Sequence, residues 1–210
     1  MFLGIVSTVF CLAGPVFSAE NVRLDATVVN AKGAPVSGVV IYAEEIEGRS
    51  FPAPKERFVM NTVDLEFKPK LLAVQVGSVV DFPNEDEVHH HLYSFSKAKK
   101  FNRPLYKGKD AKAVVFDRAG IVKVGCNIHD WMKGAILVSP TPYFAVTDET
   151  GTASIIAPPQ TLKFSVYHPR LKGKPEKTTQ TLTLKGDRTA ARWAISVREE
   201  RKVERKKSTY

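Results

Sequence analysis

The sequence is poor in cysteine: its 210 residues include two, Cys11 and Cys126. We expect Cys11 to leave with an N-terminal signal, so that the mature chain keeps Cys126 alone. A single cysteine excludes an internal disulfide. In an exported protein a free thiol is open to oxidation unless it is buried or bound to a metal. The scarcity of cysteine therefore makes Cys126 a candidate metal ligand.

Charged side chains are absent from residues 1–19, where the apolar run Phe2–Phe17 ends in the small residues Ser18 and Ala19. This pattern is typical of a secretory signal that is cleaved at the small residues. It predicts an exported, periplasmic protein. Later segments are too polar or too short to cross a bilayer as a helix, so we expect no transmembrane span in the mature chain.

Helical periodicity is also scarce. Most segments alternate apolar and polar residues over a few positions and end in turn residues, which is typical of strands. Many short strands at regular spacing predict an all-β fold made of β-sandwiches. The expected strands are 22–29, 39–43, 64–67, 71–76, 79–82, 92–96, 113–116, 121–125, 135–138 and 162–167.

The cysteine stands in a cluster of metal-ligand side chains. Cys126, His129 and Met132 follow one another in a loop between two predicted strands. A thiolate, an imidazole and a thioether together select copper, with methionine as a weak axial ligand. A tight loop can direct its three side chains to one point. The sequence therefore predicts a mononuclear copper site that needs one more ligand from elsewhere in the chain.

We expect that ligand among three consecutive histidines, His89, His90 and His91, at the start of a predicted strand. Neighbouring side chains of a strand point to opposite faces, so His90 occupies one face and the other two share the opposite one. We favour His90, which would face inward together with Leu92. His89 and His91 stay open as alternatives.

From about Leu71 to Val138 the chain resembles a cupredoxin, a blue copper domain. The spacing of Cys126, His129 and Met132 is similar to that of amicyanin, whereas plastocyanin has a longer gap before its methionine. The wider sequence resembles exported cupredoxin-domain proteins that are often labelled methylamine-utilisation proteins. The resemblance implies a Greek-key β-sandwich that binds one copper ion through His90, Cys126, His129 and Met132.

We expect further residues to support the copper ligands in a second layer. His91 stands where the family usually has asparagine, and its backbone N–H is expected to approach the ligand sulfur. Asn84 lies in the loop before the histidines, and Trp131 lies between two of the ligands in the sequence. The shell expected to limit water at the site comprises Phe82, Leu92, Trp131 and Ile136.

Segments on both sides of the cupredoxin-like part resemble the halves of a second sandwich of the transthyretin or carboxypeptidase-regulatory type. Two arrangements are open: a sandwich split around the cupredoxin, or an N-terminal extension followed by a separate C-terminal β-domain. We expect a signal peptide at 1–19, a first accessory part at 20–55, a cupredoxin domain at 56–139, a second accessory part at 140–197 and a charged, disordered tail at 198–210.

The net charge is +9, and a basic run follows the histidines on an expected loop. Such a run is typical either of a docking patch for an acidic redox partner or of an ordinary solvated loop. Nucleic-acid binding is not expected, because the chain is exported and lacks a recognised binding motif. The basic residues are Lys97, Lys99, Lys100, Arg103, Lys107 and Lys109.

These patterns predict a periplasmic copper protein that transfers single electrons between redox partners. We do not expect an enzyme, because no acid–base pair or nucleophile accompanies the site and Met132 would occupy its axial side. Two alternatives stay open. One is a copper-binding or delivery protein without a redox role, and the other is a structural β-protein whose site is degenerate.

Overall fold

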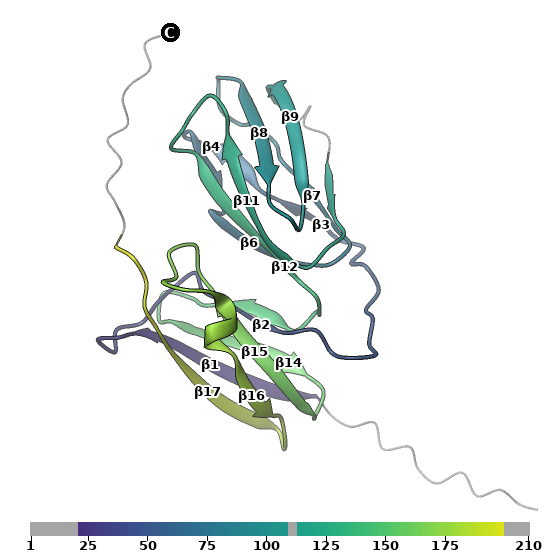
Figure 1. The fold of residues 1–210 in the computed structure, drawn as a ribbon, viewed down its shortest axis with the longest axis vertical. Coiled ribbons are helices and arrows are strands. Elements are labelled where there is room, and N and C mark those ends of the chain that lie inside the picture. Colours follow the sequence, from purple (N-terminus) through teal and green to yellow (C-terminus); the bar gives the residue numbers. More distant parts are fainter. Residues whose placement is uncertain (1–20, 109–112, 200–210) are drawn as a thin grey trace, which may run out of the picture.

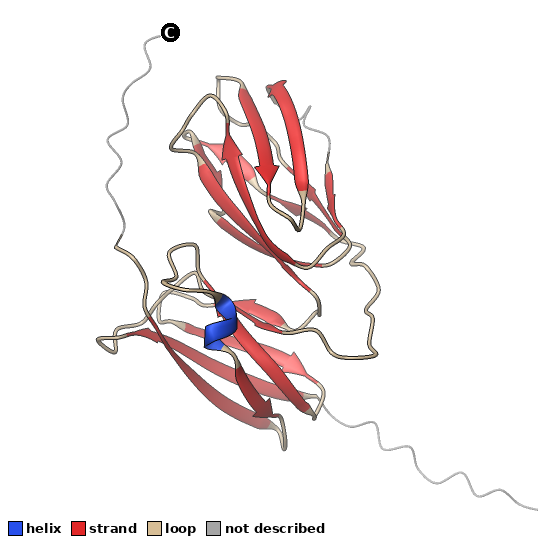
Figure 2. Cartoon of the chain, viewed as in Figure 1, coloured by secondary structure: helices blue, strands red, loops and turns tan. Residues whose placement is uncertain are grey.

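The computed structural model describes residues 21–108 and 113–199, and this part of the chain is almost entirely β-structure. It contains seventeen strands and one short 3-10 helix, η1 (Pro175–Thr178) (Figure 2). The all-β prediction is confirmed. The expected signal peptide and most of the expected tail lie outside the described residues. Within the described ranges, no helix is long and apolar enough to cross a membrane.

The strands form two layered units, one above the other in Figure 1. We call the first unit the site sandwich. Its larger sheet runs in the order β6 (Leu71–Gln75), β12 (Lys133–Ser139), β11 (Gly120–Cys126), β8 (His90–Phe95) and β9 (Lys100–Tyr106). Its other strands are β10 (Val114–Phe116), β7 (Ser78–Asp81) and β3 (Arg57–Val59) in one sheet, and the hairpin of β4 (Asn61–Val63) and β5 (Glu66–Lys68).

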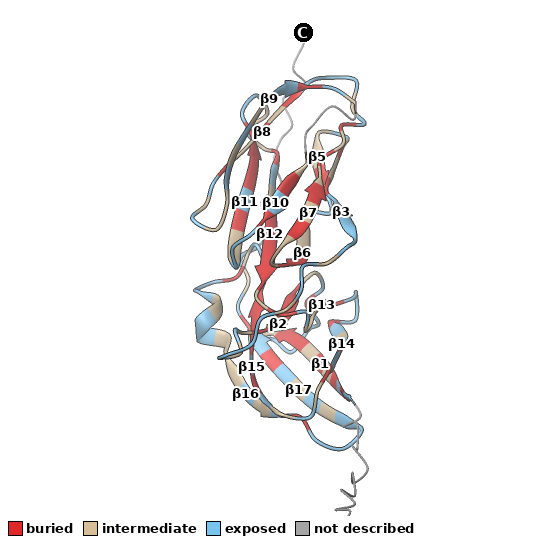
Figure 3. Cartoon of the chain, turned by 90° about the vertical axis from the view of Figure 1, so that its right-hand side faces the viewer, coloured by how far each residue is buried: buried red, intermediate tan, exposed pale blue. Residues whose placement is uncertain are grey.

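The site sandwich is held by an apolar core between its sheets. Val80 and Phe116 come from the smaller sheet, and Leu92, Val122 and Ile136 come from the larger one. Along β8, buried residues alternate with more exposed ones, as a strand with one face in a core requires. On β11, exposed Lys123 lies between the buried Val122 and Val124, and the strand ends in buried residues. Figure 3 shows these buried positions along the strands. The core thus fixes which side chains of β8 and β11 point inward.

We call the second unit the flanking sandwich. Its core surrounds the buried Trp193. One of its sheets has the order β14 (Thr152–Ala157), β1 (Val22–Asn30) and β17 (Arg188–Ile195). The other has the order β13 (Phe144–Val146), β2 (Val40–Ala43), β15 (Thr161–Tyr167) and β16 (Gln180–Thr183).

The flanking sandwich takes strands from both ends of the described chain. β1 pairs antiparallel with β14 and parallel with β17. β2 pairs antiparallel with both β13 and β15. β1 and β2 thus precede the site sandwich in sequence, and their partner strands follow it.

A third apolar cluster joins the two units. Val40 and Tyr167 of the flanking sandwich pack with Ala73, Ala135 and Leu137 of the site sandwich. The last three lie on β6 and β12, on the face turned away from the core of the site sandwich. The outer face of the five-stranded sheet is therefore covered in part by the flanking sandwich.

Part of the basic run after β8 lies on a strand and not on the expected loop, because Lys100 and Arg103 belong to β9. Lys97 and Lys99 precede this strand and Lys107 follows it, whereas Lys109 lies outside the described residues. β9 pairs antiparallel with β8 at the edge of the sheet, with a register shift near His90. Charged side chains and Pro104 are tolerated there because one side of an edge strand needs no ladder partner. These residues hide the alternation that marks strands in the centre of a sheet.

The expected strand at 64–67 also needs correction at its start. Asp64 and Leu65 have positive φ values of 56° and 58° and form the turn between β4 and β5. Strand structure begins only at Glu66. Non-glycine residues with such angles are typical of tight two-residue hairpins, which single-sequence patterns do not mark when no glycine is present.

Candidate metal centre

The strand pairing brings the two halves of the predicted site together. β8 and β11 are antiparallel neighbours, and Cys126 lies opposite Leu92. The start of β8, which carries His90, therefore meets the end of β11, which carries Cys126. The loop after β11 turns back, since the Cys126 N–H donates to the Met132 carbonyl at 3.2 Å and the Met132 N–H donates to the His129 carbonyl at 2.9 Å.

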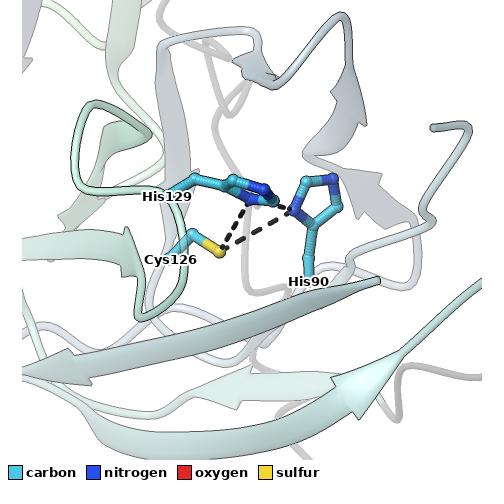
Figure 4. A group of neighbouring side chains, drawn as sticks. All are labelled: His90, Cys126 and His129. Atoms are coloured by element: carbon cyan, nitrogen blue, oxygen red, sulfur yellow. Dashed lines mark hydrogen bonds between the residues drawn. The ribbon is translucent and has the colours of Figure 1, made fainter. Parts of the chain in front are cut away.

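Three predicted ligand atoms face one another at this corner (Figure 4). Cys126 Sγ lies 3.7 Å from His90 Nδ1 and 3.6 Å from His129 Nδ1. The two histidine Nδ1 atoms lie 3.2 Å apart. His90 and Cys126 are buried, and His129 is half-exposed. These side chains form a cluster that could hold a metal ion.

The triangle has the size that one metal ion requires. With bonds of about 2.0 Å to nitrogen and about 2.3 Å to sulfur at about 120°, the nitrogens lie about 3.5 Å apart and each about 3.7 Å from the sulfur. The distances in the structure are 3.2, 3.6 and 3.7 Å. Small side-chain shifts would bring all three atoms onto one ion, so the donor set and its geometry fit a mononuclear site.

The surroundings favour a thiolate at Cys126. Burial raises the pKa of the thiol, but the hydrogen bond with His90 and those from the backbone N–H groups of His91, Ile128 and His129 outweigh it, so the pKa is lowered. Thiolate is the form that binds metals. The lowered pKa therefore favours the form of the sulfur that a soft metal requires.

The two histidines differ in their electrostatics. Burial lowers the pKa of His90, but hydrogen bonds with Cys126 and Asp86 outweigh it and raise the pKa above its ordinary value. Burial and the neighbouring positive charge of His90 lower the pKa of His129. His129 is therefore the more readily neutral of the two, which suits a ligand that must offer a free electron pair.

Met132 ends the loop, and its side chain lies in the core of the site sandwich. It is buried, and it belongs to the same apolar cluster as Leu92, Cys126 and Ile136. Its main chain bonds to both Cys126 and His129, as described above. The thioether thus comes from the same short loop that supplies two of the triangle's corners.

Among the three consecutive histidines, only His90 points to the cluster. His90 has an exposed fraction of 0%, whereas His89 is exposed and His91 is half-exposed. The His91 ring hydrogen-bonds to Asn102 Oδ1 at 2.5 Å, away from the site, while its backbone N–H bonds to the Cys126 sulfur. His91 therefore supports the site through its main chain.

Asp86 is a site residue that the sequence patterns do not reveal. Its Oδ2 lies 2.8 Å from His90 Nε2, and its side chain is 12% exposed. A carboxylate that accepts from one ring nitrogen keeps the proton there and leaves the other nitrogen free for a metal. Asp86 therefore directs Nδ1 of His90 toward Cys126. The only signal in the sequence is an acidic residue four positions before the histidine.

Asn84 contacts the loop that carries Asp86. Its Nδ2 donates to the carbonyls of Val88 at 2.8 Å and Tyr106 at 3.2 Å, and its Oδ1 accepts from the Asp86 N–H at 2.9 Å. The loop that carries Asp86 is thus fixed by a buried amide. Asn84 supports the cluster through Asp86 and not by direct contact.

Trp131 lies beside the outer histidine. Its ring centroid is 5.4 Å from that of His129, at an interplanar angle of 47°. Its indole Nε1 is buried and has no hydrogen-bond partner within the described part of the chain. The ring therefore limits the positions that His129 can take and shields one side of it.

Replacing Asp86 with alanine should weaken copper binding. The buried Nε2 of His90 would lose its hydrogen-bond acceptor, and the ring would no longer be held in its orientation. Loss of such a partner typically lowers metal affinity by about 10–100-fold. Competition titration with a chelator of known copper affinity measures the change. The matched control is Glu87→Ala, because Glu87 is adjacent and its side chain is 96% exposed. Equal affinities in the two variants would contradict this role.

Comparisons with known proteins give no match to a protein-family model and none to a curated protein. Among solved structures, a reduced mutant of amicyanin matches with 21% identity and a TM-score of 0.38, over 41% of this chain and 86% of that one. A purple cupredoxin from Nitrosopumilus maritimus matches with 28% identity and a TM-score of 0.35, over 39% and 99%. A copper-containing nitrite reductase from Thermus scotoductus covers 55% of this chain and 28% of that one, with 22% identity and a TM-score of 0.39. The solved structures to which this chain is similar thus include amicyanin and a second cupredoxin. Each similarity covers about two fifths of this chain.

Proposed function

We propose that this protein binds one copper ion through His90, Cys126 and His129, with Met132 as the axial ligand, and transfers single electrons. The observation that carries the proposal is the triangle of one sulfur and two nitrogen atoms with sides of 3.2–3.7 Å. Copper bound there would cycle between Cu(II) and Cu(I). The protein's own contribution is to hold the ligands and limit water.

The choice of copper depends on the chemistry of the donors. A single thiolate with two imidazoles and a thioether is the donor set of blue copper sites, in which a long axial methionine tunes the potential. Structural zinc sites instead combine only cysteine and histidine, with four close ligands. Met132, which is buried in the same core cluster as Cys126 and lies three residues after His129, favours copper over zinc.

Electron transfer suits the burial of the ligands. His90 and Cys126 have exposed fractions of 0% and 3%, so an external molecule has no direct access to them. His129 is half-exposed, and its neighbour Ile128 is an exposed apolar side chain. An electron can leave through the His129 ring at an apolar surface. A delivery protein would need ligands that solvent and a second chelator reach easily, which counts against that alternative.

The proposed activity is tested by voltammetry of the copper-loaded protein. We expect one reversible one-electron wave, because the ligands are preformed and need not rearrange between oxidation states. The same protein loaded with zinc is the control and should give no wave. An irreversible wave, with copper lost on reduction, would contradict electron transfer and support delivery.

Replacing His90 with alanine should remove the strong visible absorption of the copper-loaded protein, because the triangle loses a corner that no neighbour fills. His89→Ala is the matched control, since His89 is exposed and adjacent. The control should keep the spectrum of the unchanged protein. A spectrum that survives His90→Ala but not His89→Ala would move the ligand to His89.

We further propose a periplasmic location and a redox protein as partner. Support for an acidic partner comes from the net charge of +9. The basic run offers less support, since Lys99 pairs with Asp117 and Lys107 pairs with Glu87. These ion pairs reduce the positive charge that the run presents.

We propose two domains from the same arrangement: 56–139 as the copper domain, and 20–55 with 140–197 as one split accessory domain. The separate cores of the two sandwiches support this division.

A further inference from the structure

A groove of about 990 Å³ opens between the outer face of the five-stranded sheet and the flanking sandwich. The apolar contact between the two units covers β12 at Ala135 and Leu137. Beyond that contact the same face is uncovered, and the turn after β15, from Tyr167 to Arg170, forms the opposite wall. Volumes of this size are typical of sites for small organic ligands.

The floor and walls of the groove are mainly apolar. The Tyr93 ring lies against Gly125, so close that a Cβ atom there would be 3.0 Å from it. Phe95 stands beside Tyr93 with a ring centroid distance of 5.1 Å and is 79% exposed. Covering the exposed surface of a large aromatic side chain beside a groove is favourable in free energy, because it removes apolar area from water. The groove therefore suits a ligand with an apolar body.

The charged side chains of the groove are all basic. Lys70, Lys123, Lys133 and Arg170 line it, and no aspartate or glutamate does. Lys70 pairs with Glu66 at 3.3 Å. No salt bridge joins the other three to a carboxylate within residues 21–108 and 113–199. Arg170 donates to the Arg198 carbonyl at 3.3 Å. Lys123 and Lys133 are therefore the cations best placed to meet an external anion.

We propose that this groove binds a small organic anion with an apolar body, such as an aromatic or aliphatic carboxylate. The body lies against Tyr93 and Phe95, and the anionic group faces Lys123 and Lys133. The register supports the second contact, because Lys133 lies opposite Gly125 on the neighbouring strand and Lys123 comes two residues before Gly125 on β11. Both lysines and Gly125 therefore project from the same face of the sheet. The flanking sandwich completes the site with its turn.

The site is distinct from the metal centre, although one strand serves both. Gly125 faces the groove, and the next residue, Cys126, faces the core. The proposal does not depend on copper binding. It can therefore be tested on metal-free protein, so that its failure says nothing about the proposed electron transfer.

The test is titration calorimetry of the full, metal-free chain with two probes of the same shape, naphthaleneacetate and its neutral amide. We expect one naphthaleneacetate to bind per chain. The neutral amide should bind at least about tenfold more weakly, because one charge-assisted contact contributes about that factor. The double variant Lys123→Gln/Lys133→Gln should bind the acetate as weakly as the amide, with its affinity for the amide unchanged.

The matched control is Lys32→Gln/Lys185→Gln, which removes the same charge from exposed positions of the flanking sandwich. It should bind both probes like the unchanged protein. If both double variants lost the same affinity for naphthaleneacetate, the effect would come from net charge alone, and the proposal would be overturned. Absence of acetate binding, or equal affinities for acetate and amide, would overturn it as well.

A second measurement needs no variant. In amide NMR spectra of the unchanged protein, the acetate should shift the resonances of Gly125 and Tyr167 from the two sides of the groove. Shifts confined to other surfaces would overturn the assignment even if calorimetry shows binding.

The replacement Lys123→Arg/Lys133→Arg keeps the positive charge and should keep the calorimetric affinity for naphthaleneacetate.

Discussion

Replacing Cys126 with serine should abolish the intense visible absorption of the copper-loaded protein. That absorption requires a thiolate bonded to copper, and Cys126 is the free cysteine of the described chain, buried at the end of β11. A serine hydroxyl is a harder donor and stays protonated, so the remaining two imidazoles would hold copper weakly. The visible spectrum at equal copper loading measures the effect.

Two control variants separate loss of the thiolate from damage to the loop. Ile128→Ala changes an exposed apolar residue of the same loop and should keep the band. Met132→Gln replaces the proposed axial donor and should keep a thiolate band while changing the reduction potential. A serine variant that retains the full band would show that Cys126 is not a copper ligand.

Replacing Trp193 with alanine should cost about 3–5 kcal/mol of the free energy of unfolding. Trp193 is 2% exposed in the core of the flanking sandwich, and its Nε1 donates to the Thr178 carbonyl at 2.9 Å. It lies on β17, which pairs with β1 and so links the two ends of the described chain. The loss is a large part of the 5–15 kcal/mol that is typical of a folded domain.

Urea unfolding measures this loss, with Arg192→Ala as the matched control. Arg192 is adjacent and exposed, so its replacement should change the free energy of unfolding by less than about 0.5 kcal/mol. Because Trp193 is not part of the core around the metal site, folded Trp193→Ala protein should keep the copper spectrum. A similar stability for both variants would contradict the role given to this core.

Much of the candidate site could be predicted because its proposed ligands are close in sequence or fixed by strand geometry. Cys126, His129 and Met132 share one loop, so their residue types and spacing carry the information. His90 could be favoured over His89 and His91 because alternation in a strand separates the faces. The pairing of β8 with β11, which brings the two segments together, depends on the whole sandwich.

Asp86 could not be predicted because its role depends on the path of a loop. The segment before β8 is rich in acidic residues, and nothing in the order of residues distinguishes Asp86 from Glu85 or Glu87. Asn84, which bonds to the Asp86 N–H, and the Leu65 N–H, which donates to Asp86 Oδ2 at 3.2 Å, hold this carboxylate beside His90. Loop conformations of this kind are set by tertiary contacts and not by local pattern.

Several strands were not predicted from the sequence, for different physical reasons. β9 lies at a sheet edge, where charged residues and a proline interrupt the alternation. β3 and β4 are three residues long, too short for a period to be recognised. On β17 the less exposed positions before the buried Trp193 are the small residues Thr189 and Ala191, so that its inward face is weakly marked.

The visible absorption spectrum of the unchanged, copper-loaded protein tests the central proposal most directly. We expect one copper per chain and an intense thiolate-to-copper band that disappears on reduction and returns on oxidation, because Cu(I) has a filled d shell. Zinc-loaded protein, with the same ligands in place, should show no such band. Copper-loaded protein without the band would contradict both the site formed by His90, Cys126 and His129 and the electron-transfer function proposed for it.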